Sequence, residues 1–519
     1  MGKNKKNNKV AELLAADKLK LEDIKSDFIT VASHQLRTPI SAIRWSLDTL
    51  LSGQVGNLLE KQREIIREAY QNNNFMVKVV GDLLRVSRLE EKGLDLMPKF
   101  IDLKKIIKNL IAKHKNFAQA SNCTIDFDAE PHLPKVYVDP LYLEPVLNAL
   151  IDNAIRYTKQ KGRVKIGLKK SKKYVLIKIK DNGIGIPENQ KHLVFSKFFR
   201  GLNAIKTQTE GLGLNLYLAK KVIEASGGKI GFISQENKMT IFFIYLPTFK
   251  ASPIEMTKRE TEKPEDILRK EREFVSITVH ELKAPLGTTK WSLEMLKSQR
   301  PGKLNGEQIE LINQIYRGNE RLLVLVRDLL NLAKLQEGKF EVEPKMIILE
   351  EVVSDVINGF KAQAKEKKIK IQWPSKKTNL PKIIADPNRI AQVITNLLSN
   401  AIKYTPRGGK VSINLDQKTG KKLKKISNTL VSSQINFIDN KKGYLILAVK
   451  DTGIGISPEE QNKLFTRFFR SKKVLSSESE GTGLGLYITK SIINLHQGDI
   501  WFTSKLGKGS TFYISLPIA

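Results

Sequence analysis

The chain has 519 residues, 41% hydrophobic and 27% charged, which excludes an intrinsically disordered chain and allows roughly three to four domains. No apolar stretch approaches the ~18 residues that span a bilayer, and the basic N-terminus lacks the apolar core of a signal peptide, so we expect a cytoplasmic protein without an integral membrane segment. The net charge is +34, but lysines are spread along the chain, which indicates a solvated surface and no nucleic-acid partner. The single cysteine, Cys123, is interpreted as structural.

The first predicted element is a helical hairpin over residues 1–95. Its first helix carries an apolar stripe at steps of three and four, and a second helix follows around residues 64–89. A lone hairpin leaves an apolar face uncovered, so two hairpins should pair into a four-helix bundle, either between two chains or within one. The stripe consists of Ile24, Phe28, Ala32, Leu36, Ile40, Ile43, Leu47 and Leu50.

Residues 96–248 change to mixed helix and strand patterns. A strand-like run, YVLIKIKD, leads into the glycine-rich turn DNGIGIP at Asp181. Upstream, Asp139 and Pro140 supply an N-cap and a first-turn residue for a helix that carries Asn153, whose amide oxygen suits Mg²⁺. Downstream, the glycine run EGLGLNLYLAK opens a helix, where backbone N–H groups suit a triphosphate.

After a polar linker at 249–265, the same order repeats. HQLRTPISAIRWSLDTLL at His34 returns as HELKAPLGTTKWSLEMLK at His280, 246 residues later. The offset is 247 for the asparagine-bearing helix and 270 for the aspartate turn, DTGIGIS at Asp451. The increase of 23 residues marks an insertion (QKTGKKLKKISNTLVSSQ) that we interpret as a solvated loop or a hairpin extension.

The second repeat divides in the same way. Its hairpin covers residues 266–338, with a second helix around 307–335, and its mixed domain covers 339–519. The stripe of this hairpin consists of Phe274, Thr278, Leu282, Leu286, Thr289, Leu293 and Leu296.

One histidine in each hairpin is a candidate nucleophile. His34 and His280 lie two positions beyond a stripe residue, which turns them from the buried seam toward solvent. Pro39 and Pro285 follow five residues later and predict a bend in each helix. An exposed neutral imidazole is a good nucleophile toward phosphorus, so this pattern favours phosphoryl chemistry.

These motifs, together with FSKFFR and FTRFFR, occur in one order twice, and the chain resembles the histidine kinases over almost its whole length. HQLRTP and HELKAP resemble the phospho-acceptor box. The resemblance implies a multidomain fold, in which two α-helical hairpins of the four-helix-bundle dimerisation and phosphotransfer type are each followed by an α/β sandwich of the GHKL ATPase (Bergerat) type. It also implies ATP and Mg²⁺ as cofactors, a response-regulator receiver domain on a separate chain as partner, and a homodimer or an intramolecular pseudo-dimer.

The resemblance further assigns roles to individual residues. Asp181 and Asp451 would hold the adenine amine, and Asn153 and Asn400 would hold magnesium. A mobile ATP lid would lie between the phenylalanine and glycine boxes. The other nucleotide-binding candidates are Gly183, Gly185, Arg156, Arg200, Gly211 and Gly213 in the first repeat, and Asn396, Lys403, Tyr404, Gly453, Gly455, Arg470, Gly481, Gly483 and Gly485 in the second.

The two repeats differ at the acceptor histidine. Glu281 beside His280 can accept or orient the imidazole proton, whereas Gln35 beside His34 can only orient it. The first repeat departs further in its nucleotide domain, with Ala149 in place of Asn396, Asn215 in place of Gly485, and Pro145 interrupting the asparagine-bearing helix. We therefore expect the second repeat to be the active kinase, with ordinary drift in a working first site as the alternative.

The opposite asymmetry appears four residues after each histidine. In the family that the chain resembles, a threonine or asparagine at this position positions water for dephosphorylating the regulator; the first repeat has Thr38 there, and the second has Ala284. The hypothesis is that the first repeat accepts phosphate or acts as a phosphatase, unless Thr38 merely packs in its helix. Two other functional classes remain open: a GHKL ATPase coupled to nucleic acid, and a non-catalytic signalling scaffold.

Overall fold

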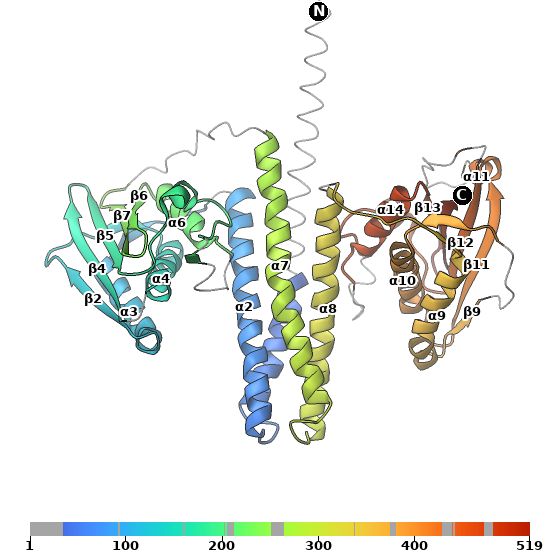
Figure 1. The fold of residues 1–519 in the computed structure, drawn as a ribbon, viewed down its shortest axis with the longest axis horizontal. Helices are drawn as coiled ribbons and strands as arrows, with labels where there is room; N and C mark the ends of the chain where they lie inside the picture. Colours follow the sequence, from blue (N-terminus) through green and yellow to red (C-terminus); the bar gives the residue numbers. More distant parts are fainter. Residues whose placement is uncertain are drawn as a thin grey trace, which may run out of the picture. The chain divides into compact units, whose positions relative to one another are not determined.

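The computed structural model describes residues 35–91, 94–158, 161–201, 203–204, 212–250, 264–336, 338–373, 380–427, 439, 442–471 and 481–518. They belong to two compact bodies, one ending at Leu323 and the other beginning at Val324 (Figure 1). His34, Gly211, the start of the first stripe and most of the predicted linker lie outside the described residues.

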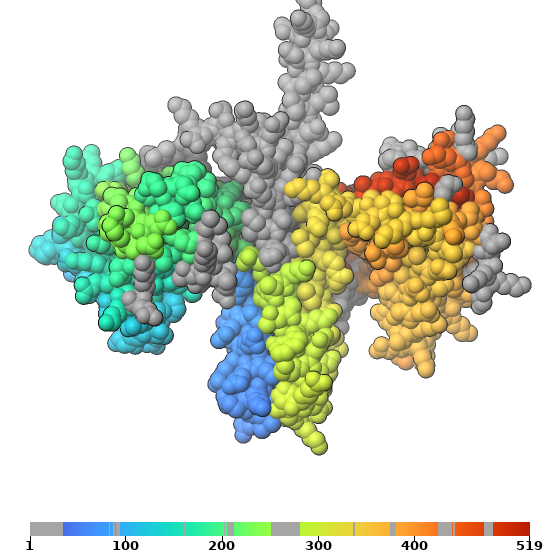
Figure 2. Space-filling view, in the orientation of Figure 1, coloured from blue at the N-terminus to red at the C-terminus, as the bar shows by residue number. Residues whose placement is uncertain are grey.

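The N-terminal body contains a helical bundle. Residues 35–51 are helical and are followed by α2, and α7 is followed in the same way by α8. The two predicted stripes are confirmed over Leu36–Leu50 and Leu282–Leu296, where no stripe residue is more than 3% exposed. α2 and α7 pack side by side, so the two hairpins of one chain cover each other (Figures 1 and 2). The labelled helices are α2 (Glu60–Glu91), α7 (Pro264–Lys297) and α8 (Gly306–Gln336).

Two corresponding glutamines fasten the hairpins together at their turns. Gln62, 1% exposed, donates hydrogen bonds from Nε2 to the carbonyls of Gly302 (3.0 Å) and Lys303 (3.2 Å) in the other hairpin. Gln308, 3% exposed and 246 residues further on, donates to the equivalent carbonyls, those of residues 56 (3.3 Å) and 57 (3.4 Å). Each Oε1 also accepts the N–H of the residue three positions earlier, at 3.0 Å. The reciprocity is that of a two-fold symmetric interface, here formed within one chain.

The mixed domain of the N-terminal body is a two-layer α/β sandwich. Its sheet has the order β2-β4-β5-β7-β6, with β2 parallel to β4 and the other neighbours antiparallel. Helices α3, α4 and α6 pack on one face, against the alternate strand residues that point inward (Figure 1). The elements are β1 (Lys99–Ile101), α3 (Leu103–Ala120), β2 (Cys123–Ala129), β3 (Val136–Val138), α4 (Pro140–Arg156), β4 (Gly162–Ser171), β5 (Tyr174–Asp181), η1 (Glu188–Leu193), α6 (Asn215–Ala225), β6 (Lys229–Gln235) and β7 (Met239–Pro247).

The C-terminal body repeats this topology. Its sheet has the order β13-β14-β12-β11-β9, with β9 parallel to β11, and α9, α10 and α14 take the places of α3, α4 and α6. The predicted α/β sandwich therefore occurs twice. The elements are β8 (Lys345–Ile347), α9 (Leu349–Glu366), β9 (Lys370–Gln372), β10 (Ile383–Ala385), α10 (Pro387–Tyr404), β11 (Lys410–Thr419), α11 (Gly420–Ser427), β12 (Gly443–Asp451), α12 (Pro458–Gln461), α14 (Gly485–Leu495), β13 (Ile500–Lys505) and β14 (Gly509–Pro517).

One expectation about the backbone requires correction. Pro145 does not interrupt its helix, because α4 runs on to Arg156; a proline this close to the N-terminus removes only one ladder hydrogen bond. The insertion was interpreted as a solvated loop or a hairpin extension; its described part forms α11 between the paired strands β11 and β12, and Leu423 of α11 is buried against Tyr444 and Trp501. Of the described helices, none is both long and apolar enough to cross a membrane.

Candidate functional sites

A buried aspartate ends the central strand of each sheet. Asp181 ends β5, and its carboxylate accepts the backbone N–H of Gly183 at 2.9 Å. Asp451 ends β12 and accepts the N–H groups of Gly453 (2.8 Å) and Ser510 (3.2 Å). Burial raises the pKa of Asp181 to about 6 and also raises the pKa of Asp451, while the backbone hydrogen bonds oppose the change. Such a carboxyl group has acceptor capacity left for an amine on a ligand.

The turn after each aspartate requires its glycines. A Cβ on Gly183 would lie 2.2 Å from the carbonyl oxygen of Tyr157, and Gly453 meets the equivalent carbonyl at 2.5 Å. Gly185 and Gly455 have φ values of +63° and +68°, which favour glycine. The glycines thus let the turn pack closely against the end of the asparagine-bearing helix.

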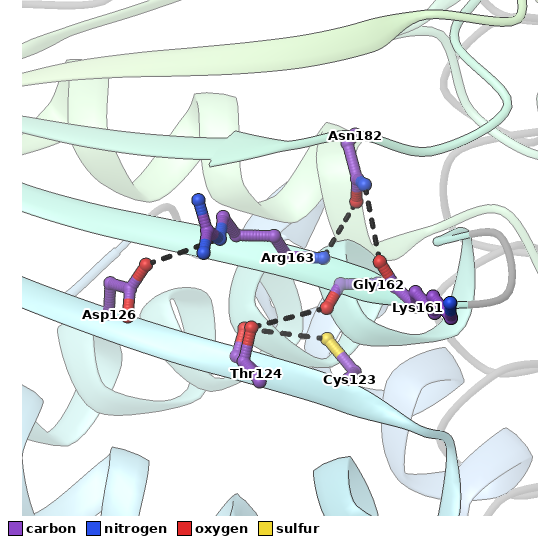
Figure 3. A network of polar contacts seen from close by, with 7 residues as sticks. All are labelled: Cys123, Thr124, Asp126, Lys161, Gly162, Arg163 and Asn182. Atoms are coloured by element: carbon purple, nitrogen blue, oxygen red, sulfur yellow. Dashed lines mark hydrogen bonds and ion pairs between the residues drawn. The ribbon is translucent and has the colours of Figure 1, made fainter.

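The residue after Asp181 fastens this turn to the neighbouring strand (Figure 3). Asn182 accepts the N–H of Arg163 at 2.7 Å and donates to the carbonyl of Lys161 at 3.5 Å. In the second repeat Thr452 takes this place, accepting the N–H of residue 410 at 3.0 Å. Cys123 lies in the same network; burial raises the pKa of its thiol, which fits a structural cysteine.

The asparagine-bearing helices, α4 and α10, begin as predicted. Asp139 and Asp386 are N-caps whose side chains accept backbone N–H groups two residues on, both at 2.9 Å. In the first repeat, α4 contributes to a cavity of about 160 Å³, and α2 forms part of its wall. The sequence-predicted residues that line this cavity are Asn153, Arg156, Asp181, Gly185, Arg200 and Gly213.

The predicted phosphate-binding cations differ between the repeats. Arg156 is held by Asp152, with Nε 2.7 Å from a carboxylate oxygen, and its guanidinium lies over the Phe117 ring. In the second repeat the corresponding positions are Lys403 and Ser399, so the acidic partner at this position is missing. Asp152 was not predicted as a site residue, although its spacing of four residues from Arg156 on one helix indicates an ion pair.

Lys403 therefore lies in a positively charged environment. Burial, then repulsion from Arg470 and from Lys367, lower its pKa to about 8. Lys367 is fixed nearby by hydrogen bonds from Nζ to the carbonyls of Ile402 (3.2 Å) and Lys403 (3.0 Å). A Cβ added to Gly481, in the glycine run, would lie 3.1 Å from Lys403 Nζ. An anionic ligand at this place would relieve the repulsion.

Both glycine runs open their helices with the same backbone geometry. Gly213 and Gly483 have φ values of +66° and +71°, and a Cβ on either would collide with backbone of the phenylalanine box. Phe198 and Phe468 in that box also have positive φ, +61° and +57°. The short distances from these glycines to the phenylalanine box show that the box and the glycine run pack together in both repeats. The positive φ of the two phenylalanines is a strained backbone conformation that both repeats share. The predicted ATP lids, around residues 205–211 and 472–480, lie outside the described residues.

A contact between α8 and the second glycine run was not predicted. Thr482 donates a hydrogen bond to Asp328 at 2.7 Å, and burial raises the pKa of Asp328 to about 6. Leu212 stands at the equivalent position of the first repeat and cannot donate such a bond. Thr482 and Asp328 are 154 positions apart, so no local sequence pattern links them.

The acceptor residues are described in part. His280 lies in α7, which continues through Pro285 without a break, but its side chain lies outside the described part of the chain. Glu281 is half-buried beside it. In the first hairpin Gln35 is half-buried, and Thr38 lies on an exposed face, as does Ala284 in the second hairpin.

Comparison with known families identifies both kinds of domain. The model for the histidine kinase-, DNA gyrase B- and HSP90-like ATPase matches residues 138–250 and 385–519. The model for the His Kinase A (phospho-acceptor) domain matches residues 24–92 and 270–338. Together the two models cover most of the chain, each of them twice.

Individual relatives match about half of the chain. The non-motile and phage-resistance protein of Caulobacter vibrioides is 32% identical over 266 residues, 50% of this chain and 29% of the relative. The sensor histidine kinase WalK of Bacillus subtilis is 33% identical over 251 residues, 47% of this chain and 36% of the relative. A solved structure, full-length ShkA in complex with AMPPNP, is 26% identical with a TM-score of 0.37, covering 48% of this chain and 46% of that one. The chain thus spans about a third of the length of these two curated relatives.

Proposed function

Because the chain belongs to the histidine kinase family, with the phospho-acceptor domain and the ATPase domain each present twice, we propose that it is an ATP-dependent protein-histidine kinase of a two-component system. The second repeat is the kinase. The phosphoryl group passes from histidine to the aspartate of a response-regulator receiver domain on a separate chain. The first repeat serves as phosphoryl acceptor or as phosphatase.

The cation cluster of the second repeat carries this proposal. Lys403 is partly buried close to Arg470 and Lys367, and burial, followed by repulsion from these two cations, lowers its pKa to about 8. The glycine run at Gly481 lies beside this charge. A triphosphate supplies the compensating negative charge, and the buried carboxyl of Asp451 supports recognition of a base amine.

In the proposed reaction a nitrogen of the His280 imidazole attacks the γ-phosphorus of ATP. The N–P bond forms as the bond from the γ-phosphorus to the bridging oxygen breaks, and ADP leaves. Glu281 accepts the imidazole proton. Magnesium, held by Asn400 in the second repeat and by Asn153 in the first, would neutralise charge on the phosphates when bound. In the second step a carboxylate oxygen of the receiver attacks phosphorus, the N–P bond breaks, and the imidazole is regenerated.

We also infer that the protein works as a single-chain equivalent of a dimer. The reciprocal hydrogen bonds of Gln62 and Gln308 support pairing between the hairpins of one chain rather than between two chains. A fused pair holds two different repeats in a fixed stoichiometry. This arrangement allows one repeat to specialise in phosphorylation and the other in accepting or removing phosphate.

The phosphatase role is assigned to the first hairpin on the strength of Thr38. Its hydroxyl, on an exposed face, can position a water molecule, which the methyl group of Ala284 cannot do. Thr38→Ala should slow the decay of the phosphorylated regulator by about tenfold or more. Unchanged decay would assign Thr38 to helix packing instead.

A matched pair of variants tests the kinase assignment. The full chain is incubated with γ-labelled ATP and Mg²⁺, and Asp451→Asn is compared with Asp181→Asn. We expect acid-labile label in the parent and in Asp181→Asn, and none in Asp451→Asn. Hydrolysis of ATP stimulated by DNA, without acid-labile label, would indicate the nucleic-acid-coupled ATPase, and failure to bind nucleotide would indicate the scaffold.

A further inference from the structure

We propose that Asn215 contacts the nucleotide in the first repeat, and that Ala149 and Ala219 are the accompanying changes that make room for it. The inference rests on the proposed function in one respect, since it assumes a nucleotide in this cavity. It requires no phosphoryl transfer. It treats three departures from the second repeat as one coordinated change rather than as decay.

The second repeat shows what the three positions do together. Asn396 on α10 donates a hydrogen bond from Nδ2 to the buried hydroxyl of Thr489 on α14, at 2.8 Å. Its Oδ1 lies against the first residue of α14, Gly485, where an added Cβ would come within 2.5 Å. Gly485 has no positive φ, so space alone requires glycine there. An asparagine on α10 and a larger side chain at the start of α14 therefore exclude each other.

The first repeat has the same backbone with the side chains exchanged. α6 and α14 are both 11 residues long, beginning at Asn215 and at Gly485. The residues before them have nearly equal dihedral angles, φ −95° and ψ −22° against φ −100° and ψ −23°. α4 packs on α6 as α10 packs on α14. Asn215 thus stands at the position of Gly485.

The other two positions change to fit. Ala149 stands where the second repeat has Asn396, and Ala219 where it has Thr489. Ala219 is fully buried, so the exchange has removed both the donor and the acceptor of a buried hydrogen bond and left neither unpaired. The space in front of α6 is then free for Asn215. A change at only one of these positions would leave a buried polar group unpaired or two side chains in collision.

Asn215 lines the cavity in which the nucleotide is proposed to bind. Asn215 lines the same cavity as Asn153, Asp181 and Arg200. Its side chain makes no hydrogen bond to any other described residue. An amide at the first turn of a helix, next to an arginine, can donate to the anionic phosphate chain of a nucleotide. In the first repeat the amide therefore comes from α6, whereas in the second repeat the corresponding asparagine, Asn396, lies on α10.

The first experiment measures binding at the first repeat alone. In the full chain carrying Asp451→Asn, which silences the second site, AMPPNP with Mg²⁺ is titrated calorimetrically. Asn215→Gly should weaken affinity about tenfold or more, as expected for a lost hydrogen bond to a charged group. The melting temperature without nucleotide should change little, while the shift produced by AMPPNP should shrink. Unchanged affinity in Asn215→Gly, or no binding by the chain carrying only Asp451→Asn, would overturn the proposal.

A reciprocal experiment in the second repeat tests the coordination of the three changes. Gly485→Asn alone should lower the melting temperature, because the new side chain collides with Asn396. Combining it with Asn396→Ala and Thr489→Ala should restore the melting temperature. A triple variant no more stable than Gly485→Asn would show that the three positions are independent, which contradicts the exchange. Neither experiment depends on histidine phosphorylation, so failure of the kinase assignment would be distinguishable.

Discussion

Replacing Gln62 with alanine should weaken the pairing of the two hairpins. The side chain is 1% exposed and makes three hydrogen bonds, accepting one from Leu59 at 3.0 Å and donating to Gly302 and Lys303 at 3.0 and 3.2 Å. A net hydrogen bond is worth about 0.5–1.5 kcal/mol, so the free energy of unfolding should fall by about 2–4 kcal/mol. Gln308→Ala should cost less, since its bonds to the other hairpin are longer, at 3.3 and 3.4 Å.

The assay is urea unfolding followed by circular dichroism, with the mass in solution measured by light scattering. Gln314→Ala on α8 is the control, because this glutamine is exposed and its loss should change stability by no more than about 0.5 kcal/mol. The parent should have the mass of one chain, 58.7 kDa. If Gln62→Ala were as stable as Gln314→Ala, the hydrogen bonds of Gln62 to the other hairpin would contribute nothing to stability. If the unfolding midpoint rose with protein concentration, the hairpins would be pairing between chains.

Three further predictions follow from the charges and exposed side chains. The affinity of the second site for Mg-ATP should fall by up to about tenfold per pH unit above pH 8. The reason is that Lys403, whose pKa is about 8, loses its positive charge in this range and can no longer attract the phosphates. Calorimetry in an Asp181→Asn background should show this slope, and Lys403→Met should remove it. Burial raises the pKa of Asp181 to about 6, so the folded state holds this proton more tightly than the unfolded chain does. The resulting loss of folding stability is absent below pH 3.8 and reaches about 3 kcal/mol above pH 6. In urea titrations, Asp181→Asn should therefore stabilise the protein by up to that amount at pH 7 and give no gain at pH 3.5. Trp291 is 57% exposed and lies 11 residues beyond His280 on the same face of α7, which suits a docking contact with the regulator. Trp291→Ala should therefore slow transfer to the regulator and leave autophosphorylation unchanged. Slowing of both steps would contradict a docking role.

The sequence was sufficient for features that depend on local pattern. The buried stripes follow from periodicity, and the N-caps at Asp139 and Asp386 follow from capping chemistry. Pro145 was misread because the loss of one ladder hydrogen bond need not end a helix, and α4 continues to Arg156 with a buried apolar face. The helix in the insertion was not predicted because the segment is mostly polar, and the burial of Leu423 depends on residues distant in sequence.

Features that depend on partners distant in sequence could not be predicted. An apolar stripe shows that a face is covered but not by what, so the pairing of the hairpins within one chain required the structure. Gln62 and Gln308 read as surface residues until their partners, about 240 to 252 positions away, are known. Asn396 and Thr489, 93 positions apart, likewise gave no sign that Ala149, Asn215 and Ala219 form one exchange.

The proposed mechanism requires that the second repeat phosphorylates His280 of its own chain. The most direct test is the initial rate of acid-labile labelling from γ-labelled ATP, measured per molecule over a hundredfold range of protein concentration, for the parent, His34→Ala and His280→Ala. We predict a rate per molecule that is independent of concentration, with label lost in His280→Ala and retained in His34→Ala. A rate per molecule that rises in proportion to concentration, or label that persists in His280→Ala, would contradict it.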